Sequence, residues 1–334
     1  MAIKVGINGY GRIGRNILRA LYESKRTNEI QIVAVNDLGD AQTNAHLTQY
    51  DTAHGKFPGT VGVEGENIVV NGDKIKVFAQ RDPAKIDWAS VGAEYVFEST
   101  GFFTTKADAG KHLAGGAKKV VISAPAKDPD ITLVLGVNDD AYDADAHHIV
   151  SNASCTTNCV APLAKVLHEL GTIESGFMTT IHAYTNDQVI LDFPHKDLRR
   201  ARAAAINLIP TSTGAAKAIG LVIPDLQGKV DGISIRAPVP DGSIVDLTAH
   251  LGQGVSVEEV NGRFLEMADK GSFEGILSYS DEPLVSTDII GSSYSSIFDS
   301  DLTMTNGDEV KVFAWYDNEW GYSCRLVDLS QRLL

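Results

Sequence analysis

Cysteine is scarce in this chain, which holds three among 334 residues. So few cysteines, and an odd number of them, argue against a disulfide framework and favour a reducing compartment. We therefore expect a cytoplasmic protein whose cysteines are free thiols.

Long apolar runs and excess positive charge are also missing. No stretch approaches the ~20 apolar residues that a membrane-spanning helix needs, and the chain runs from Met1 straight into a strand pattern, which leaves no room for a signal peptide. Lysine and arginine number 29 against 43 aspartates and glutamates, giving a formal net charge of −14. An acidic chain without a basic tract is a poor candidate for binding nucleic acid or an anionic membrane.

The composition that remains is that of an ordinary globular protein, with 43% apolar and 22% charged residues. The length predicts two domains with enough material for a sizeable core. We found no internal repeat, low-complexity segment or long linker. The sequence pattern changes close to residue 150, and we place the domain boundary there.

A glycine-rich turn dominates the first domain. Residues 3–8 form a strand pattern, Gly9-Tyr-Gly-Arg-Ile-Gly14 follows, and a helix and a second strand lead to Asp37. In this β-α-β context Gly9 makes a tight turn, Gly11 lets a pyrophosphate approach the backbone, and Gly14 packs helix against strand. The pattern predicts a Rossmann dinucleotide-binding domain.

Asp37 bears on the choice of dinucleotide. Its carboxylate would accept hydrogen bonds from the adenine ribose and repel a 2′-phosphate, so we predict NAD rather than NADP. The alternative is a glycine turn that binds no nucleotide, with Asp37 only capping the next segment. The rest of the first domain also shows regular patterns. Strand patterns occur at residues 61–63, 68–70, 74–78, 94–98 and 118–123, and a helix pattern occurs at residues 106–114.

The stretch Ser151 to Cys159 carries the most chemistry. Apolar residues recur at helical spacing after it, which places Cys155 at a helix start with Ser154 as N-cap. The positive end of the helix dipole favours a thiolate there and would also hold a phosphate. From the residues alone, a buried structural cysteine remains the commoner alternative, and for Cys159 we favour packing.

The second domain is rich in strands. One of them, residues 176–184, carries His182, which by itself predicts a hydrogen-bonded strand histidine rather than a base. Residues 186–205 form a long irregular loop, and such loops inside compact domains usually have a function. Residues 210–217 place hydroxyl groups at the start of another helix, where an anion could bind. The order predicts an α+β domain with a mostly antiparallel sheet. Its strands are expected at 232–237, 243–251, 286–290, 295–298 and 310–316, and its helices at 258–269 and 318–334.

These motifs resemble the phosphorylating glyceraldehyde-3-phosphate dehydrogenase family over residues 2–334. The segments that carry the resemblance are Asn8-Gly-Tyr-Gly-Arg-Ile-Gly14, Ala153-Ser-Cys-Thr-Thr-Asn-Cys159, His182-Ala-Tyr-Thr-Asn-Asp-Gln188, Asp197-Leu-Arg-Arg-Ala-Arg-Ala-Ala204 and Trp315-Tyr-Asp-Asn-Glu-Trp-Gly-Tyr322.

The resemblance implies a thioester mechanism in sugar breakdown or synthesis. Cys155 attacks the aldehyde of glyceraldehyde 3-phosphate, His182 takes the proton as hydride passes to NAD, and inorganic phosphate cleaves the thioester to give 1,3-bisphosphoglycerate. It also implies two anion sites. The attacking phosphate is assigned to Ser154, Thr156, Thr213 and Gly214, and the substrate phosphate to Thr185 and Arg236.

NAD is the only cofactor implied, and no metal is expected. The implied cofactor contacts are Gly9, Arg12, Ile13, Asp37, Arg81, Thr100, Ser123, Asn318 and Tyr322. The family also implies a homotetramer in which the loop of residues 186–205 lines a neighbour's dinucleotide site. Its terminal helix returns to the cofactor domain, so we expect residues 1–150 with 318–334 as one domain and 151–317 as the other.

The sequence departs from the family pattern at two places, and two alternative functions remain. Phe193 stands where leucine is common, and residues 236–243 differ from the commoner form near the substrate phosphate. The enzymatic rival is erythrose-4-phosphate dehydrogenase; Thr185-Asn186 and Thr213-Gly214 favour the glyceraldehyde branch. The rival from another class is a surface-binding role on the same fold, in place of the chemistry or alongside it.

Overall fold

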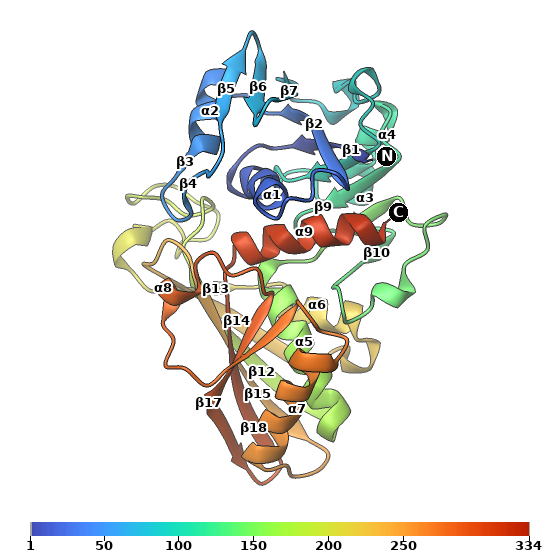
Figure 1. The fold of residues 1–334 in the computed structure, drawn as a ribbon. Helices are drawn as coiled ribbons and strands as arrows, with labels where there is room; N and C mark the ends of the chain where they lie inside the picture. The colour runs from blue at the N-terminus through green and yellow to red at the C-terminus, as the bar shows by residue number, and fades with distance from the viewer. Residues whose placement is uncertain (1, 334) are drawn as a thin grey trace. The chain divides into compact units, whose positions relative to one another are not determined.

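The computed structural model describes residues 2–333, so Met1 and Leu334 of the predicted domains and terminal helix lie outside the described residues. The chain folds into two compact units (Figure 1). The first unit contains residues up to Leu133, then Asp140–Ala153 and Ser323 onward. The second contains Val134–Asp139 and Ser154–Tyr322.

The first unit is built on a sheet whose strand order is β10-β11-β9-β8-β1-β2-β7-β6-β5. The strands from β10 to β7 pair in parallel, whereas β5, β6 and β7 form an antiparallel meander. Its strands are β1 (Ile3–Asn8), β2 (Ile30–Asn36), β5 (Val61–Glu64), β6 (Asn67–Val70), β7 (Asp73–Phe78), β8 (Tyr95–Glu98), β9 (Lys119–Ile122), β10 (Ile131–Thr132) and β11 (Ile149–Ser151).

Helices and short ribbons complete this unit. They are α1 (Arg12–Glu23), α2 (Ala41–Gln49), α3 (Lys106–Ala109), α4 (Lys111–Ala114), the part of α9 (Trp320–Arg332) from Ser323 onward, and the small hairpin β3 (Tyr50–Asp51) with β4 (Gly55–Lys56). The helix predicted over residues 106–114 is interrupted at Gly110, which separates α3 from α4. The end of α9 is tied to the unit by Arg26, which pairs with Asp328, and by Tyr95, whose hydroxyl donates to the Leu333 carbonyl across 3.2 Å.

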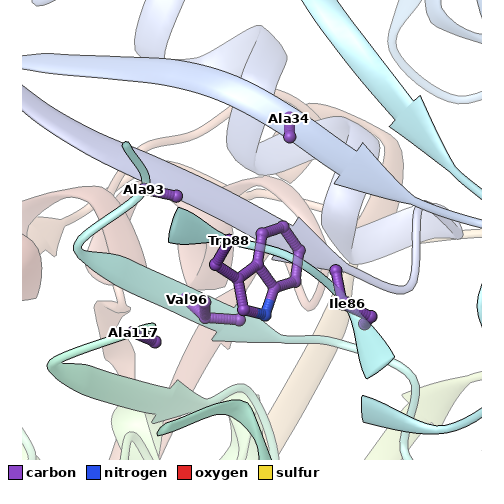
Figure 2. Packing of buried hydrophobic residues seen from close by; sticks show 6 residues of the cluster. All are labelled: Ala34, Ile86, Trp88, Ala93, Val96 and Ala117. Carbon is purple, nitrogen blue, oxygen red and sulfur yellow. The ribbon is translucent and has the colours of Figure 1, made fainter. Parts of the chain in front are cut away.

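The core of the first unit includes a cluster around Trp88, with Ala34, Ile86, Ala93, Val96 and Ala117 (Figure 2). Trp88 is completely buried, and its ring takes the space that a Cβ on Gly6 of β1 would need, only 2.4 Å from Trp88 Cζ3. Glycine at this position therefore lets the indole pack directly on the strand.

The second unit is built on a sheet of order β13-β14-β12-β15-β18-β17-β16. β12 with β14 and β16 with β17 pair in parallel, and the other neighbours are antiparallel. The strands are β12 (Ile173–Ala183), β13 (Ile209–Ser212), β14 (Val230–Ala237), β15 (Ser243–Leu251), β16 (Leu277–Ser280), β17 (Ser296–Asn306) and β18 (Glu309–Tyr316). The helices are α5 (Cys155–Gly171), α6 (Ala215–Val222), α7 (Val257–Lys270) and α8 (Ser286–Ile289).

The predicted fold class, a parallel α/β domain with a mostly antiparallel α+β domain, is confirmed. The strand predicted at residues 286–290 is wrong, because Ser286–Ile289 is the short helix α8. The Asp288 carboxylate accepts the Val285 N–H across 2.8 Å, and this local capping bond outweighs the strand preference of the two isoleucines. β13 and β16 were not predicted, since neither segment alternates clearly.

Candidate active site

A glycine turn between β1 and α1 forms the first part of the site. Gly9 has a φ of +89°, and a Cβ there would lie 2.6 Å from the Thr100 nitrogen. A Cβ on Gly14 would lie 2.2 Å from the Gly9 carbonyl, whereas one on Gly11 would meet nothing within 4 Å. The turn is therefore closely packed behind and open in front at the helix N-terminus, which is the cradle that a pyrophosphate needs.

Asp37 follows β2 and contacts the glycine turn. Its two carboxylate oxygens accept the backbone N–H groups of Tyr10, across 3.1 Å, and Gly39, across 2.8 Å. The carboxylate is thus held rigidly just after β2, where it can face a ribose. The arrangement fits the unphosphorylated ribose of NAD and would repel a 2′-phosphate.

The other candidate cofactor residues of the first unit occupy neighbouring strand and helix ends. Thr100 follows β8, and its N–H donates to Glu98 across 2.9 Å; Ser123 follows β9, and its N–H donates to the Glu98 carbonyl across 3.0 Å. Arg12 begins α1 and pairs with Asp51. The last two candidate cofactor residues of this unit are Ile13, which is half-buried and follows Arg12, and Arg81, which is exposed and follows β7.

Cys155 is the first residue of α5. Ser154 caps the helix, its hydroxyl accepting the Thr157 N–H across 3.0 Å, and the residue before it, Ala153, has a φ of +53°. This left-handed residue turns the chain sharply from β11 into the helix. The prediction that Cys155 lies at a helix start is confirmed.

His182 reaches Cys155 from β12. Its Nε2 atom lies 3.4 Å from the Cys155 sulfur, and its ring is buried edge-on against Tyr316, with ring centres 5.9 Å apart. Cys155 itself is half-buried. A thiol and an imidazole at this separation can exchange a proton directly.

The electrostatics differ from the expected thiolate. Burial raises the pKa of Cys155 to about 11, although Arg236 and hydrogen bonds from Thr156 lower it. Burial, and next Arg236, lower the pKa of His182 to about 3. Desolvation of the thiol and of the imidazole thus opposes the charged pair that the helix N-terminus favours.

Arg236 is the cation of the site. It lies opposite His182 in the register of β14 with β12, and its Nη1 is 2.6 Å from His182 Nδ1. Its Nε is buried and has no hydrogen-bond partner among residues 2–333. An arginine with an unused buried donor is suited to receive an anion.

The remaining anion-site candidates of the second unit are hydroxyls and backbone groups at helix starts. Thr156 shares a hydrogen bond with the Tyr316 hydroxyl across 2.9 Å, and the Thr213 hydroxyl accepts the Ala215 N–H across 3.2 Å. Gly214 is the N-cap of α6, and a Cβ on it would meet nothing within 4 Å. The Thr185 N–H donates to Gln188 across 3.3 Å. The Thr156 and Thr213 hydroxyls already have partners, so a bound phosphate would share or replace these bonds.

Asn318 and Tyr322 belong to the second unit. The Ser243 hydroxyl donates to Asn318 Oδ1 across 2.6 Å, and Tyr322 is buried in the first turn of α9. Of the nine candidate cofactor residues, only these two lie outside the first unit.

Sequence reasoning missed Tyr316. Its hydroxyl lies 2.9 Å from Thr156 Oγ1 and 2.8 Å from Thr180 Oγ1, so it links the helix of Cys155 to the strand of His182. The alternation of β18 would have placed it on the inward face, since Val310, Val312 and Ala314 are buried with it.

Comparisons with known proteins agree with this geometry. Residues 3–106 match the NAD binding domain model of glyceraldehyde 3-phosphate dehydrogenase, and residues 154–318 match its C-terminal domain model. The chain belongs to the glyceraldehyde-3-phosphate dehydrogenase family. Relatives bearing that name are 61% identical in Streptomyces coelicolor, 60% in Bacillus subtilis and 59% in Geobacillus stearothermophilus, each over 99% of this chain and 98% of the relative.

The two family models include most of the candidate residues, whereas Ser123 and Tyr322 lie outside both matches. The NAD binding match spans Gly9 to Thr100, and the C-terminal match begins at Ser154 and includes Cys155, His182 and Arg236. The predictions of the family and of NAD as cofactor are therefore confirmed. No helix within residues 2–333 has the length and apolarity to cross a membrane.

Proposed function

We propose that the chain converts glyceraldehyde 3-phosphate, inorganic phosphate and NAD into 1,3-bisphosphoglycerate and NADH. The observation that carries the proposal is the 3.4 Å approach of the Cys155 sulfur to His182 Nε2 at the start of α5. About 60% identity over the full length to relatives named glyceraldehyde-3-phosphate dehydrogenase supports the choice of substrate.

Cys155 and His182 divide the chemistry. The sulfur bonds to the aldehyde carbon as the thiol loses its proton, and this proton is transferred to the carbonyl oxygen, which becomes the hydroxyl of a thiohemiacetal. His182 Nε2 then removes that proton while the carbon loses hydride, leaving a thioester on Cys155. NAD, when bound, supplies the hydride acceptor. A phosphate oxygen finally attacks the thioester carbon, and the C–S bond breaks to release the acyl phosphate and the thiolate.

Two anion sites belong to the same proposal. The N-terminus of α5 with Ser154 and Thr156, and that of α6 with Thr213 and Gly214, are proposed for the attacking phosphate. Arg236, with a buried Nε that lacks a partner among residues 2–333, and Thr185 are proposed for the substrate phosphate.

Erythrose 4-phosphate is not favoured as the substrate, and a surface-binding role does not account for a paired thiol and imidazole. Turnover on the two sugar phosphates, with and without inorganic phosphate, separates the enzymes. We expect phosphate-dependent turnover and a preference for glyceraldehyde 3-phosphate. Turnover indifferent to phosphate would overturn the phosphorylating reaction.

The direct test is NADH formation from glyceraldehyde 3-phosphate, NAD and phosphate before and after treatment with iodoacetate. We expect absorbance at the NADH band before treatment and none afterwards, with one carboxymethyl group on Cys155. Full activity of protein alkylated at Cys155 would refute the thioester route.

A homotetramer in the cytoplasm completes the proposal. The loop between β12 and β13 exposes large apolar side chains, which favours burial against another subunit; they are Ile190, Leu191, Phe193, Leu198, Ile206 and Leu208. We expect Leu191→Asp to lower the sedimentation coefficient, whereas Leu265→Asp, on the exposed face of α7, leaves it unchanged. Equal sedimentation of both variants would argue against this loop as the interface. The free state of all three cysteines supports the cytoplasm.

A further inference from the structure

The side-chain amide of Asn318 is held by a hydrogen bond inside the second unit. The Ser243 hydroxyl lies 2.6 Å from Asn318 Oδ1, and the same hydroxyl oxygen accepts the Ala183 N–H across 3.0 Å. Ser243 is completely buried, and Asn318 is only 4% exposed. Ser243 therefore connects Asn318 to the backbone of the residue that follows His182.

This hydrogen bond determines which end of the amide faces Ser243. A separation of 2.6 Å is typical of an O–H···O bond and short for an N–H···O bond. The Ala183 N–H occupies one lone pair of the Ser243 oxygen, and the Ser243 proton still needs an acceptor, which Oδ1 provides and Nδ2 cannot. The amide is therefore oriented with Oδ1 toward Ser243 and Nδ2 away from it.

The Nδ2 atom of Asn318 has no hydrogen-bond partner among residues 2–333, although the side chain is buried. Ser243 thus anchors one end of the amide and leaves the other end as a fixed donor. A donor in such surroundings costs free energy unless a ligand accepts its hydrogen bond. The group that fits this position is a carbonyl acceptor.

This donor lies at the sheet end where the reaction is proposed to occur. Ser243 begins β15 and is opposite Tyr316 at the end of β18, two residues before Asn318. The Ala183 N–H that Ser243 accepts ends β12, directly after His182. Hydride transfer requires the nicotinamide ring of NAD to reach this end, and the carboxamide on that ring offers a carbonyl oxygen. Asn318, a candidate cofactor residue, has the matching donor.

We propose that Ser243 is a positioning residue for the cofactor, which fixes the Asn318 amide so that it presents a donor, and not an acceptor, to the carboxamide of nicotinamide. This inference rests on the proposed function for the place of the ring. It makes Ser243 a determinant of specificity that acts through Asn318. Dinucleotides whose ring carries a strong carbonyl acceptor are favoured over those in which this acceptor is weak.

Analogues of NAD that differ in this acceptor test the role of Ser243. Thionicotinamide adenine dinucleotide has sulfur, a weaker acceptor, in place of the carboxamide oxygen, whereas 3-acetylpyridine adenine dinucleotide keeps the oxygen and loses the NH₂ group. We expect Ser243→Ala to lower the ratio of the Kd for the thio analogue to the Kd for NAD at least about threefold. The corresponding ratio for the acetylpyridine analogue should not change. Fluorescence titration measures each Kd, and an unchanged thio ratio, or an equal change in both ratios, would overturn the inference.

Two further variants separate positioning from a loss of structure. Ser300→Ala removes another buried hydroxyl of the second unit, which donates to the Ser280 carbonyl across 2.9 Å, and should leave the thio ratio unchanged. In an Asn318→Ala background, Ser243→Ala should alter the Kd for NAD far less than it does in the wild type, because its effect passes through the amide. Equal effects of Ser243→Ala in both backgrounds would refute the positioning role.

Neutron diffraction of the unaltered protein tests the amide orientation without a variant. We expect both amide deuterons on the Asn318 atom that is farther from Ser243; deuterons on the nearer atom would overturn the inference. Neither this measurement nor the binding ratio depends on turnover. If NADH forms from glyceraldehyde 3-phosphate while the thio ratio is the same in Ser243→Ala and wild type, the inference alone fails. If no NADH forms, the proposed function fails, and the binding ratio still decides the role of Ser243.

Discussion

The Nε2 atom of His112 lies 2.9 Å from the Glu98 carboxylate, and both side chains are completely buried in the first unit. The Trp88 indole donates to the other ring nitrogen of His112 across 3.0 Å, which fixes the proton of a neutral ring on Nε2. Glu98 also accepts from Asn8 and from both the N–H and the hydroxyl of Thr100. The tryptophan core in Figure 2 is thereby linked to the strand ends beside the glycine turn.

Glu98→Gln should disturb this network at its centre. The amide that replaces one carboxylate oxygen would face at least one N–H group, of Asn8, His112 or Thr100, that can only donate. We therefore expect the unfolding free energy to fall by about 2–4 kcal/mol and NAD to bind more weakly. Urea denaturation and fluorescence titration with NAD measure the two effects. Glu94→Gln, which breaks a pair with exposed Lys118, should change both far less. Similar losses in the two variants would argue against a buried positioning network.

Asp37→Ala should relax the preference for NAD. The variant loses the carboxylate that repels a 2′-phosphate, so we expect the ratio of kcat/KM with NAD to that with NADP to fall at least about tenfold. Asp40→Ala is a matched control, because it removes the same charge nearby but only uncaps α2, where Asp40 accepts the Thr43 N–H. A ratio that is unchanged in Asp37→Ala, or equally changed in both, would count against the ribose contact.

Cys155→Ser should abolish aldehyde oxidation while NAD binding stays measurable. A hydroxyl with a pKa far above that of a thiol cannot form the thioester at a useful rate, and we expect kcat to fall by at least about three orders of magnitude. Cys159→Ser should stay active, because that sulfur is buried and faces Ser296 and the Ala314 carbonyl rather than a base. Steady-state NADH formation compares the variants, and comparable rates for wild type and Cys155→Ser would exclude the nucleophile.

The sequence predicts those parts of the site that depend on local order. The glycine turn, the acid after β2 and the cysteine at a helix start each lie within a few residues, so spacing and capping rules are sufficient. The pairing of Cys155 with His182 is different. It depends on the packing of α5 on the second sheet, and in the sequence only the family resemblance indicates it.

Features that depend on burial were not predicted. The alternation of β18 indicates that Tyr316 faces inward, but its hydrogen bonds to Thr156 and Thr180 follow only from the packing of β18 in the sheet. The thiol illustrates the same limit, because the helix dipole can be inferred from the sequence, whereas the desolvation that raises the pKa of Cys155 to about 11 cannot. Short elements such as α8 were missed because one capping bond decides them.

The pH dependence of the unfolding free energy tests the protonation of Asp241, a buried acid of the second unit. Burial, and then repulsion from Asp317 and Glu319, raise the pKa of Asp241 to about 9, while the Gly242 N–H donates to its Oδ1 across 2.9 Å. Because the folded pKa exceeds the unfolded value of 3.8, the folded state holds an extra proton between these limits. The stability that the protonated Asp241 contributes is fully present below about pH 4 and is lost as the pH rises toward about 9.

Asp241→Asn should remove this loss. The amide resembles the protonated carboxyl, keeps an oxygen for the Gly242 N–H and carries no charge toward Asp317. We expect the variant and the wild type to unfold with similar free energies near pH 4. The variant should then become more stable than the wild type by at least about 1 kcal/mol as the pH approaches 9. Urea denaturation at several pH values measures the difference, and a difference that stays flat across that range would show that Asp241 is ionised in the folded chain.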